Sequence, residues 1–236
     1  MGFACFVCGR NPQTKHAQPC ERIWLARASR SASIAAMRDE GVTKYQCLLE
    51  PGDSPAAADI AELSACRQRL FAQGLIGVYP DGIGYGNLSV RIKSSNRFFI
   101  TGTQTGAKPT LTAADFTEVI DYSIGDNRVH CRGKIAASSE SMTHAAVYEI
   151  NPTIGAIIHV HSRALWQQGM QHLPTTAATV AYGTPAMATE MRRLYETSEL
   201  PRLKILIMAG HEEGLITFGA TLAEAEQVLQ RSLQSI

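Results

Sequence analysis

Three histidines that follow two apolar segments have the clearest chemical potential in this 236-residue sequence. His159 and His161 close a segment that begins at Ile157, and residues two apart on a strand point to the same face. His211 follows the second segment, where Gly210 permits a sharp exit of the chain. Three neutral imidazoles with an open fourth position are typical of a catalytic divalent-metal site. Considered alone, the H-x-H spacing is equally consistent with two histidines that form hydrogen bonds in the core, without a metal ion. Considered alone, His211 is consistent with an ordinary loop histidine.

A second group of candidates lies at a predicted helix start. Ser138 and Ser139 precede Glu140, and the unpaired N–H groups and the dipole of a helix N-terminus attract anions. Beside a metal ion, Glu140 can act as a general acid or base on a carbonyl substrate. His144, one helical turn further on, is expected to support the site or to pack beneath it. Helix capping by Ser139 is the alternative interpretation.

Two glycine-rich loops add further donors for an anion. Gly86 allows close approach of the backbone, and the side-chain amide of Asn87 can donate. Thr101-Gly102 and Thr105-Gly106 offer hydroxyl and backbone N–H groups. The first loop is not a dinucleotide-binding fingerprint, because a predicted strand follows it where a helix should begin. A plain glycine-rich hairpin is the alternative interpretation of that loop.

Apolar periodicity predicts the elements that position these residues. Helices are predicted over 55–73, 139–150, 163–170, 185–198 and 222–233. Strands are predicted over 88–93, 97–101, 119–124, 128–131, 154–161, 204–208 and 215–218, with an extended segment over 37–54. Because several strands adjoin through short turns, we expect an α/β fold in which helices cover a mainly antiparallel sheet.

The composition limits the class of protein. Hydrophobic residues make up 45% of the chain. No apolar run approaches the roughly 20 residues of a membrane span, so we expect no membrane partner. The net charge is +1 and residues 1–36 are the basic part, so the remainder lacks the footprint of a nucleic-acid-binding protein. Cys47, Cys66 and Cys131 follow no disulfide framework, which favours a reducing compartment such as the cytoplasm.

Residues 1–36 are interpreted as an N-terminal extension, disordered or not native, ahead of a domain over 37–236. The extension could hold a zinc knuckle, although its spacing matches no standard one. The residues concerned are Cys5, Cys8, His16 and Cys20. It could also be a transit-type segment, since its second half is rich in Arg and Ser. We favour a third interpretation, in which the native chain starts at Met37.

Taken in order, these motifs resemble those of the class II aldolase/adducin family. They are Gly86–Ser89, Ile100–Gly106, Ser138–His144, His159–Ser162, and His211 with Gly214 and Gly219. Each motif is weak by itself, but five in the same order form a specific pattern. The resemblance covers roughly residues 58–236 and implies a three-layer α/β/α fold around a mainly antiparallel sheet.

The resemblance further implies a divalent-metal-dependent lyase. His159, His161 and His211 would hold Zn²⁺, or Mn²⁺, Fe²⁺ or Co²⁺ in its place. Glu140 would move the proton as an enediolate forms from a small hydroxy-carbonyl compound, such as a sugar phosphate. The implied phosphate site consists of Gly86, Asn87, Ser138 and Ser139 with either Thr101-Gly102 or Thr105-Gly106. Members of the family usually form homotetramers with the active site at a subunit interface.

Other activities and two departures from the family pattern are also to be considered. Glu140 favours aldol cleavage over epimerisation, for which similar enzymes carry Asp, while a dehydratase or decarboxylase stays open. A non-catalytic adducin-like interaction module is disfavoured, because the three histidines and Glu140 are present. Glu212 and Glu213 depart from the usual residues after His211. They could reshape the pocket or add a ligand, and their charge would repel a phosphate. No counterpart of the family's tyrosine-bearing tail follows the last predicted helix.

Overall fold

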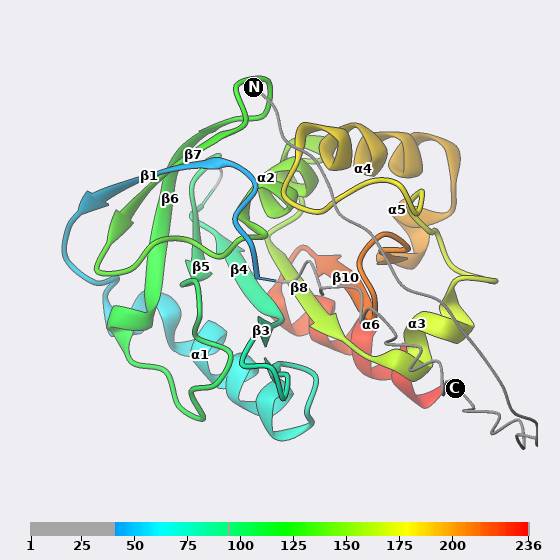
Figure 1. Cartoon of the computed structure of the whole chain (residues 1–236), viewed down its shortest axis with the longest axis horizontal. Coiled ribbons are helices and arrows are strands. Elements are labelled where there is room, and N and C mark those ends of the chain that lie inside the picture. The colour runs from blue at the N-terminus through cyan, green and yellow to red at the C-terminus, as the bar shows by residue number, and fades with distance from the viewer. Residues whose placement is uncertain (1–40, 94, 236) are drawn as a thin grey trace, which may run out of the picture. The chain divides into compact units, whose positions relative to one another are not determined.

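The computed structural model describes residues 41–93 and 95–235 (Figure 1). The predicted extension over 1–36, its cysteines and the boundary at 37 lie outside these residues. The helices are α1 (Ala57–Ala72), α2 (Ser141–Ile150), α3 (Arg163–Gly169), α4 (Pro185–Thr197), α5 (Leu200–Leu203) and α6 (Leu222–Gln234), with a 3-10 turn η1 (Ala113–Asp115). The strands are β1 (Gln46–Pro51), β2 (Gly77–Val78), β3 (Gly84–Tyr85), β4 (Asn87–Arg91), β5 (Phe98–Thr101), β6 (Phe116–Ser123), β7 (Arg128–Gly133), β8 (Ala156–His161), β9 (Ile205–Ile207) and β10 (Gly214–Gly219).

The main sheet has the strand order β1-β7-β6-β5-β4-β8-β10-β9. Every neighbouring pair is antiparallel except β1 with β7, which is parallel. Several consecutive strands pair as hairpins, since their short connections allow only antiparallel neighbours. The prediction of a mainly antiparallel sheet is therefore confirmed. Strands β2 and β3 form a separate two-stranded sheet.

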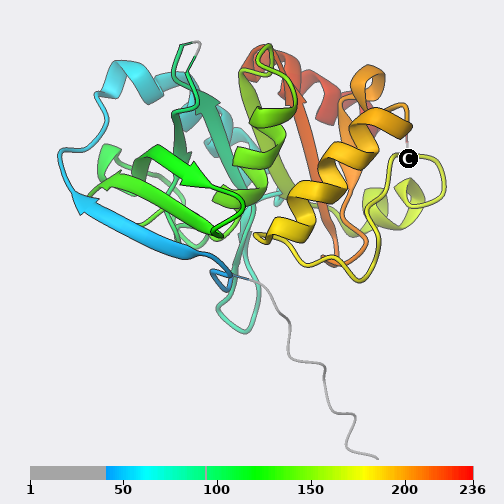
Figure 2. The ribbon, with the colours of Figure 1, turned by 90° about the horizontal axis from the view of Figure 1, so that it is seen from above.

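Helices cover both faces of the main sheet (Figure 2). On one face, Met142 of α2 and Met187 of α4 pack in a core with Ile157 of β8. On the other face, Leu63 of α1 and Leu229 of α6 pack in a second core with Ile158 of β8. Successive residues of β8 thus enter different cores, as the alternation of a strand requires. The expected three-layer α/β/α arrangement is confirmed.

The predicted helices agree with the structure to within a few residues at most ends. Helix α1 is closed by Gly74, whose φ of 71° is the left-handed conformation that glycine adopts readily after a helix. Met187, Met191 and Leu194 of α4 are buried, as their helical spacing predicts. Among residues 41–93 and 95–235, none of the helices has both the length and the apolar character to cross a membrane.

Three local predictions need correction. The extended segment over 37–54 contains strand β1, which joins the sheet edge in parallel with β7. The helix predicted from residue 139 begins at Ser141, and Glu140 takes the N-cap position. Helix α5 and strands β2 and β3 were not predicted, because two to four residues are too few to show a periodic pattern.

Candidate metal centre and active site

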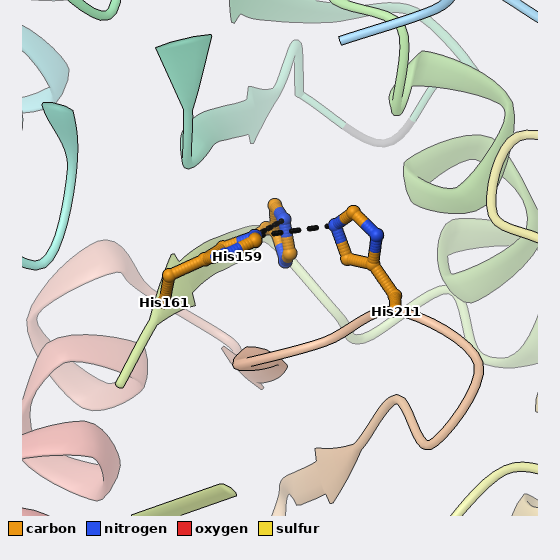
Figure 3. A group of neighbouring side chains, drawn as sticks. All are labelled: His159, His161 and His211. Atoms are coloured by element: carbon orange, nitrogen blue, oxygen red, sulfur yellow. Dashed lines mark hydrogen bonds between the residues drawn. The ribbon is translucent and has the colours of Figure 1, made fainter. Parts of the chain in front are cut away.

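The three histidines come from one strand and one turn, and Figure 3 shows them converging. His159 and His161 lie on β8 and share the face of Ile157, so both point toward α2 and α4. His211 lies in the turn between β9 and β10, where its N–H donates to the carbonyl of Met208 at 3.0 Å. Because β10 pairs with β8, this turn meets the end of β8 at which the two histidines stand.

The ring nitrogens of the three histidines are close enough to share one ion. The Nε2 atom of His161 lies 3.2 Å from the Nε2 atom of His159 and 3.2 Å from that of His211. All three side chains are buried. The Nδ1–H of His159 donates to the carbonyl of Leu215 at 3.0 Å, which leaves the Nε2 lone pair facing the cluster. Converging imidazole nitrogens of this kind fit zinc and similar divalent ions.

Glu140 completes the cluster from the start of α2. Its Oε1 atom lies 3.3 Å from His211 Nε2 and 3.7 Å from His159 Nε2. Its side chain is buried, and neither carboxylate oxygen has a hydrogen-bond partner among the described residues. A buried carboxylate in this condition is unfavourable without a compensating charge. A divalent ion among the histidines would supply that charge, so the orphaned oxygens also fit a metal centre.

Burial sets the protonation states of these groups. It raises the pKa of Glu140 to about 8 and lowers the pKa of His159 to about 4. Burial and the neighbouring His159 also lower the pKa of His211 well below its ordinary value. At neutral pH the imidazoles of His159 and His211 are therefore neutral, which is the form that binds metal ions. The metal-free Glu140 then keeps its proton through most of the neutral range.

A small polar pocket contains most of the predicted anion-binding residues. It is lined by Gly41, Gly84, Gly86, Asn87, Gly102, Thr103, Gln104, Thr105, Gly106, Ser138 and Ser139. Thr101 does not line it, because the Thr101 hydroxyl accepts from the backbone N–H of Leu88 at 3.3 Å within the sheet. Of the two threonine-glycine candidates, Thr105-Gly106 therefore lies wholly at the pocket and Thr101-Gly102 only through its glycine. Gly84 and Thr103 belong to the two glycine-rich loops that the sequence indicates as sources of donors. Gly41 and Gln104 were not predicted, since loop packing brings them there.

The pocket adjoins the histidine cluster. Asn87 on β4 pairs with His159 on β8, and Ser139 directly precedes Glu140. The Oδ1 atom of Asn87 is buried without a hydrogen-bond partner among the described residues. Buried polar groups are normally satisfied, so this oxygen is placed to accept a hydrogen bond from a ligand or a water molecule. The site thus combines a metal-type cluster with an adjoining group of uncharged polar residues.

One buried cation shapes the pocket without entering its lining. The guanidinium of Arg67 donates to the carbonyls of Thr105 and Gly106 at 3.0 and 3.2 Å and to that of Pro109 at 3.3 Å. These hydrogen bonds fix the carbonyl groups of the loop that contains Thr105 and Gly106, which lines one side of the pocket. Gly106 itself is sterically required, because a Cβ atom there would lie 2.2 Å from the carbonyl oxygen of Gly77.

His144 packs beneath the site, one of the two roles that the sequence suggests. Its Nδ1 atom lies 2.7 Å from the Ser89 hydroxyl, which is also 2.8 Å from the Tyr148 hydroxyl. All three side chains are buried between β4 and α2. This network joins the helix that carries Glu140 to the strand that carries Asn87.

Three residues near the cluster have no signal in the sequence. Tyr79 contacts His161, with its hydroxyl 2.7 Å from Nδ1. The Tyr182 ring lies 4.6 Å from the His211 ring between centroids, and the Lys44 ammonium lies 3.4 Å from the centroid of Tyr182. None of the three shares a spacing pattern with the histidines, so only their packing reveals them.

Glu213 and Glu212 do not extend the cluster of possible ligands, which consists of the three histidines. The Glu213 carboxylate instead accepts hydrogen bonds from Tyr79 at 2.9 Å and from Arg163 at 2.7 Å. Glu212 is largely exposed and lies 3.4 Å from Arg163. Neither acidic residue lines the polar pocket, so a direct contact with an anion bound there is not part of their role.

The fold and the family comparison define the class of this protein. Residues 61–231 match the family model described as the class II aldolase and adducin N-terminal domain. The chain therefore belongs to the class II aldolase/adducin family, as its motifs suggest.

Solved structures of similar proteins agree on the fold. YgbL from Klebsiella pneumoniae is 20% identical with a TM-score of 0.55, and the match covers 76% of this chain and 88% of that one. L-fuculose-1-phosphate aldolase from Thermus thermophilus is 24% identical with a TM-score of 0.51, covering 75% of this chain and 86% of that one. L-fuculose 1-phosphate aldolase from Glaciozyma antarctica is 20% identical with a TM-score of 0.51, covering 76% of this chain and 72% of that one. At these identities the likeness establishes the shared fold.

Proposed function

We propose that this protein is a divalent-metal-dependent lyase that cleaves or forms a carbon–carbon bond in a small hydroxy-carbonyl compound, probed first as a sugar phosphate. The observation that carries the proposal is the buried Glu140 carboxyl beside three converging imidazoles, with its Oε1 atom 3.3 and 3.7 Å from two of the Nε2 atoms. A structural hydrogen-bonding cluster would not explain two buried carboxylate oxygens without donors.

The proposed ligands are His159, His161 and His211, and the proposed ion is Zn²⁺ or another divalent ion such as Mn²⁺, Fe²⁺ or Co²⁺. When bound, such an ion supplies a Lewis acid that stabilises negative charge developing on a substrate oxygen. Three protein ligands leave room for substrate, as in catalytic sites. Burial of the three histidines excludes bulk water, and it keeps His159 and His211 neutral for binding by lowering their pKa.

Glu140 is proposed as the acid or base that moves a proton to or from the substrate carbon. A carboxyl whose pKa lies near the working pH serves this role well, since both protonation states are then accessible. In the metal-free protein, burial holds the pKa of Glu140 at about 8. A nearby divalent cation would lower this pKa toward neutrality and below, because opposite charge favours the carboxylate.

The polar pocket is proposed to bind a phosphate or carboxylate group of the substrate. Gly86, Asn87, Ser138 and Ser139 line it from one side, and Gly102, Thr105 and Gly106 from the loop held by Arg67. Backbone N–H, hydroxyl and amide groups are suitable donors to such an anion. Two of the similar structures are L-fuculose-1-phosphate aldolases. This makes a sugar phosphate the first substrate to examine.

A homotetramer in the cytoplasm completes the proposal, as the family resemblance suggests. The sequence supports this compartment, since Cys47, Cys66 and Cys131 follow no disulfide framework. Analytical ultracentrifugation tests the assembly directly.

Elemental analysis of protein purified without chelator tests the metal centre. We expect about one divalent ion per chain in the wild type and none in His159→Ala. Metal-loaded protein is then screened with sugar phosphates and hydroxy acids, with Glu140→Gln as the inactive control. A wild type that takes up neither zinc nor manganese would refute the metal-enzyme proposal and direct attention to protein partners.

A further inference from the structure

A tyrosine and a carboxylate extend behind one of the proposed metal ligands. The Tyr79 hydroxyl lies 2.7 Å from His161 Nδ1, on the opposite side of the ring from the Nε2 atom that faces the cluster. The same hydroxyl donates to the Glu213 carboxylate at 2.9 Å. His161, Tyr79 and Glu213 therefore form a continuous chain of hydrogen bonds from the cluster toward the surface.

The direction of these hydrogen bonds follows from their proton count. Tyr79 has one hydroxyl proton, and two acceptors adjoin it, an imidazole nitrogen and a carboxylate. The ionised carboxylate is the stronger acceptor, since charge-assisted hydrogen bonds are about twice as strong as neutral ones. The tyrosine oxygen then has lone pairs to accept from Nδ1–H of His161. This arrangement leaves a lone pair on His161 Nε2, the atom that faces the other two histidines.

Glu213 is held firmly for this task. Arg163 donates to its other oxygen at 2.7 Å, so both carboxylate oxygens accept a hydrogen bond. The backbone of Glu213 adopts a φ of 67°, in the left-handed region that glycine favours. A glutamate in this conformation is strained relative to glycine. Its position next to the turn of His211 links two of the proposed ligands.

Tyr79 is also held firmly, on a tight hairpin between β2 and β3. Its backbone N–H donates to the carbonyl of Ile83 at 2.8 Å, and its carbonyl accepts from Gly82 at 2.9 Å. Its ring packs against Tyr85 with a centroid distance of 4.5 Å. The hydroxyl is thus positioned by the hairpin and not by His161 itself.

We propose that Tyr79 and Glu213 are positioning residues that hold His161 in the Nδ1–H tautomer and so strengthen metal binding at the proposed centre. The inference rests on the proposed metal site and adds two residues to it. A ligand histidine whose other nitrogen donates to a fixed acceptor is pre-oriented and more basic at the metal-facing nitrogen. The two acidic residues that follow His211 then have distinct roles. Glu213 takes part in the chain of hydrogen bonds to His161, whereas Glu212 is an exposed neighbour.

The test measures the affinity of metal-free protein for Zn²⁺ by competition with a chromophoric chelator. Tyr79→Phe removes the hydroxyl and keeps the ring, and Glu213→Gln removes the charge and keeps an acceptor. We expect Tyr79→Phe to raise the Zn²⁺ Kd about 10- to 100-fold and Glu213→Gln to raise it less. Glu212→Gln is the matched control, because it removes a neighbouring carboxylate outside the chain of hydrogen bonds, and should match the wild type.

Cobalt provides a second measurement that a general loss of stability would not alter. Co²⁺ bound at the wild-type site should show a visible ligand-field spectrum that shifts in Tyr79→Phe and not in Glu212→Gln. Circular dichroism checks that each variant is folded. If Tyr79→Phe does not fold, the measurements on Glu213→Gln decide the outcome. If Tyr79→Phe and Glu213→Gln both kept the wild-type Zn²⁺ Kd and Co²⁺ spectrum, the inference would be overturned, while the proposed metal site would be unaffected. A wild type that binds neither ion would refute the proposed function itself, and the inference with it.

Discussion

Replacing Glu140 with glutamine should stabilise the metal-free protein near neutral pH and greatly reduce the turnover of the metal-bound protein. Burial raises the pKa of this carboxyl from 4.5 to about 8, so the folded chain keeps a proton that the unfolded chain loses. Stability is therefore unaffected below pH 4.5 and falls as the pH rises toward 8. The wild type should therefore lose roughly 3 to 4 kcal/mol between pH 5 and pH 8 relative to the variant.

The assay is urea unfolding of both proteins in excess chelator at pH 5 and pH 8. The buried histidines are present in both proteins, so their titration cancels in the comparison. Saturating Zn²⁺ should remove most of the difference, because a divalent cation beside the carboxylate lowers its pKa. With metal bound, turnover of Glu140→Gln should fall about 10²- to 10⁴-fold, the usual contribution of a general acid or base.

Two results would refute this reasoning. A stability difference that is the same at pH 5 and pH 8 would mean that Glu140 ionises normally in the folded chain. Full activity in the variant with metal bound would remove the proposed proton-transfer role even if the stability result agreed.

Three further perturbations follow from the same contacts. Arg67→Met removes the donors to the loop carbonyls of residues 105, 106 and 109. It should weaken inorganic phosphate binding about tenfold by calorimetry, and unchanged binding would contradict this role. Gly106→Ala places a Cβ atom 2.2 Å from a backbone oxygen, so urea unfolding should show a loss of about 1–3 kcal/mol; wild-type stability would mean that the loop adapts freely. The pKa of His159 is about 4 in the folded chain and 6.5 in the unfolded chain. The contribution of neutral His159 to the free energy of unfolding is therefore complete above pH 6.5 and is lost as the pH falls through 4. Metal-free wild type should lose about 3 kcal/mol between pH 7 and pH 4 relative to His159→Asn, and parallel pH curves would contradict this.

The motifs could be found in the sequence because each is local. The spacing of His159 and His161 on an apolar strand predicts their common face, and β8 has this geometry. Helix α4 was predictable for the same reason, since its buried residues repeat with the helical period, whereas α2 is buried on all sides and its end was predictable from Asn151-Pro152. The sequence indicates only an extended segment where strand β1 lies, because half-exposed residues at a sheet edge carry no such signal.

Local pattern fails where a residue's role depends on a distant partner. Thr101 and Thr105 look alike as hydroxyl donors, yet the first bonds within the sheet and the second lines the pocket. Tyr79 lies 82 residues from His161 in the chain, and no periodicity connects them. Glu213 looked like a candidate ligand beside His211, but it faces Tyr79 and Arg163.

By itself, the sequence determined the family motifs, the order of the main helices and strands, and the chemical types available to a site. The tertiary structure alone decided that His211 meets His159 and His161, and that Glu140 is buried beside them. The physical reason is that distance and dehydration are properties of packing. The pairing of β8 with β10 and the burial of α2 against the sheet bring these groups together and remove their water, which shifts their pKa values.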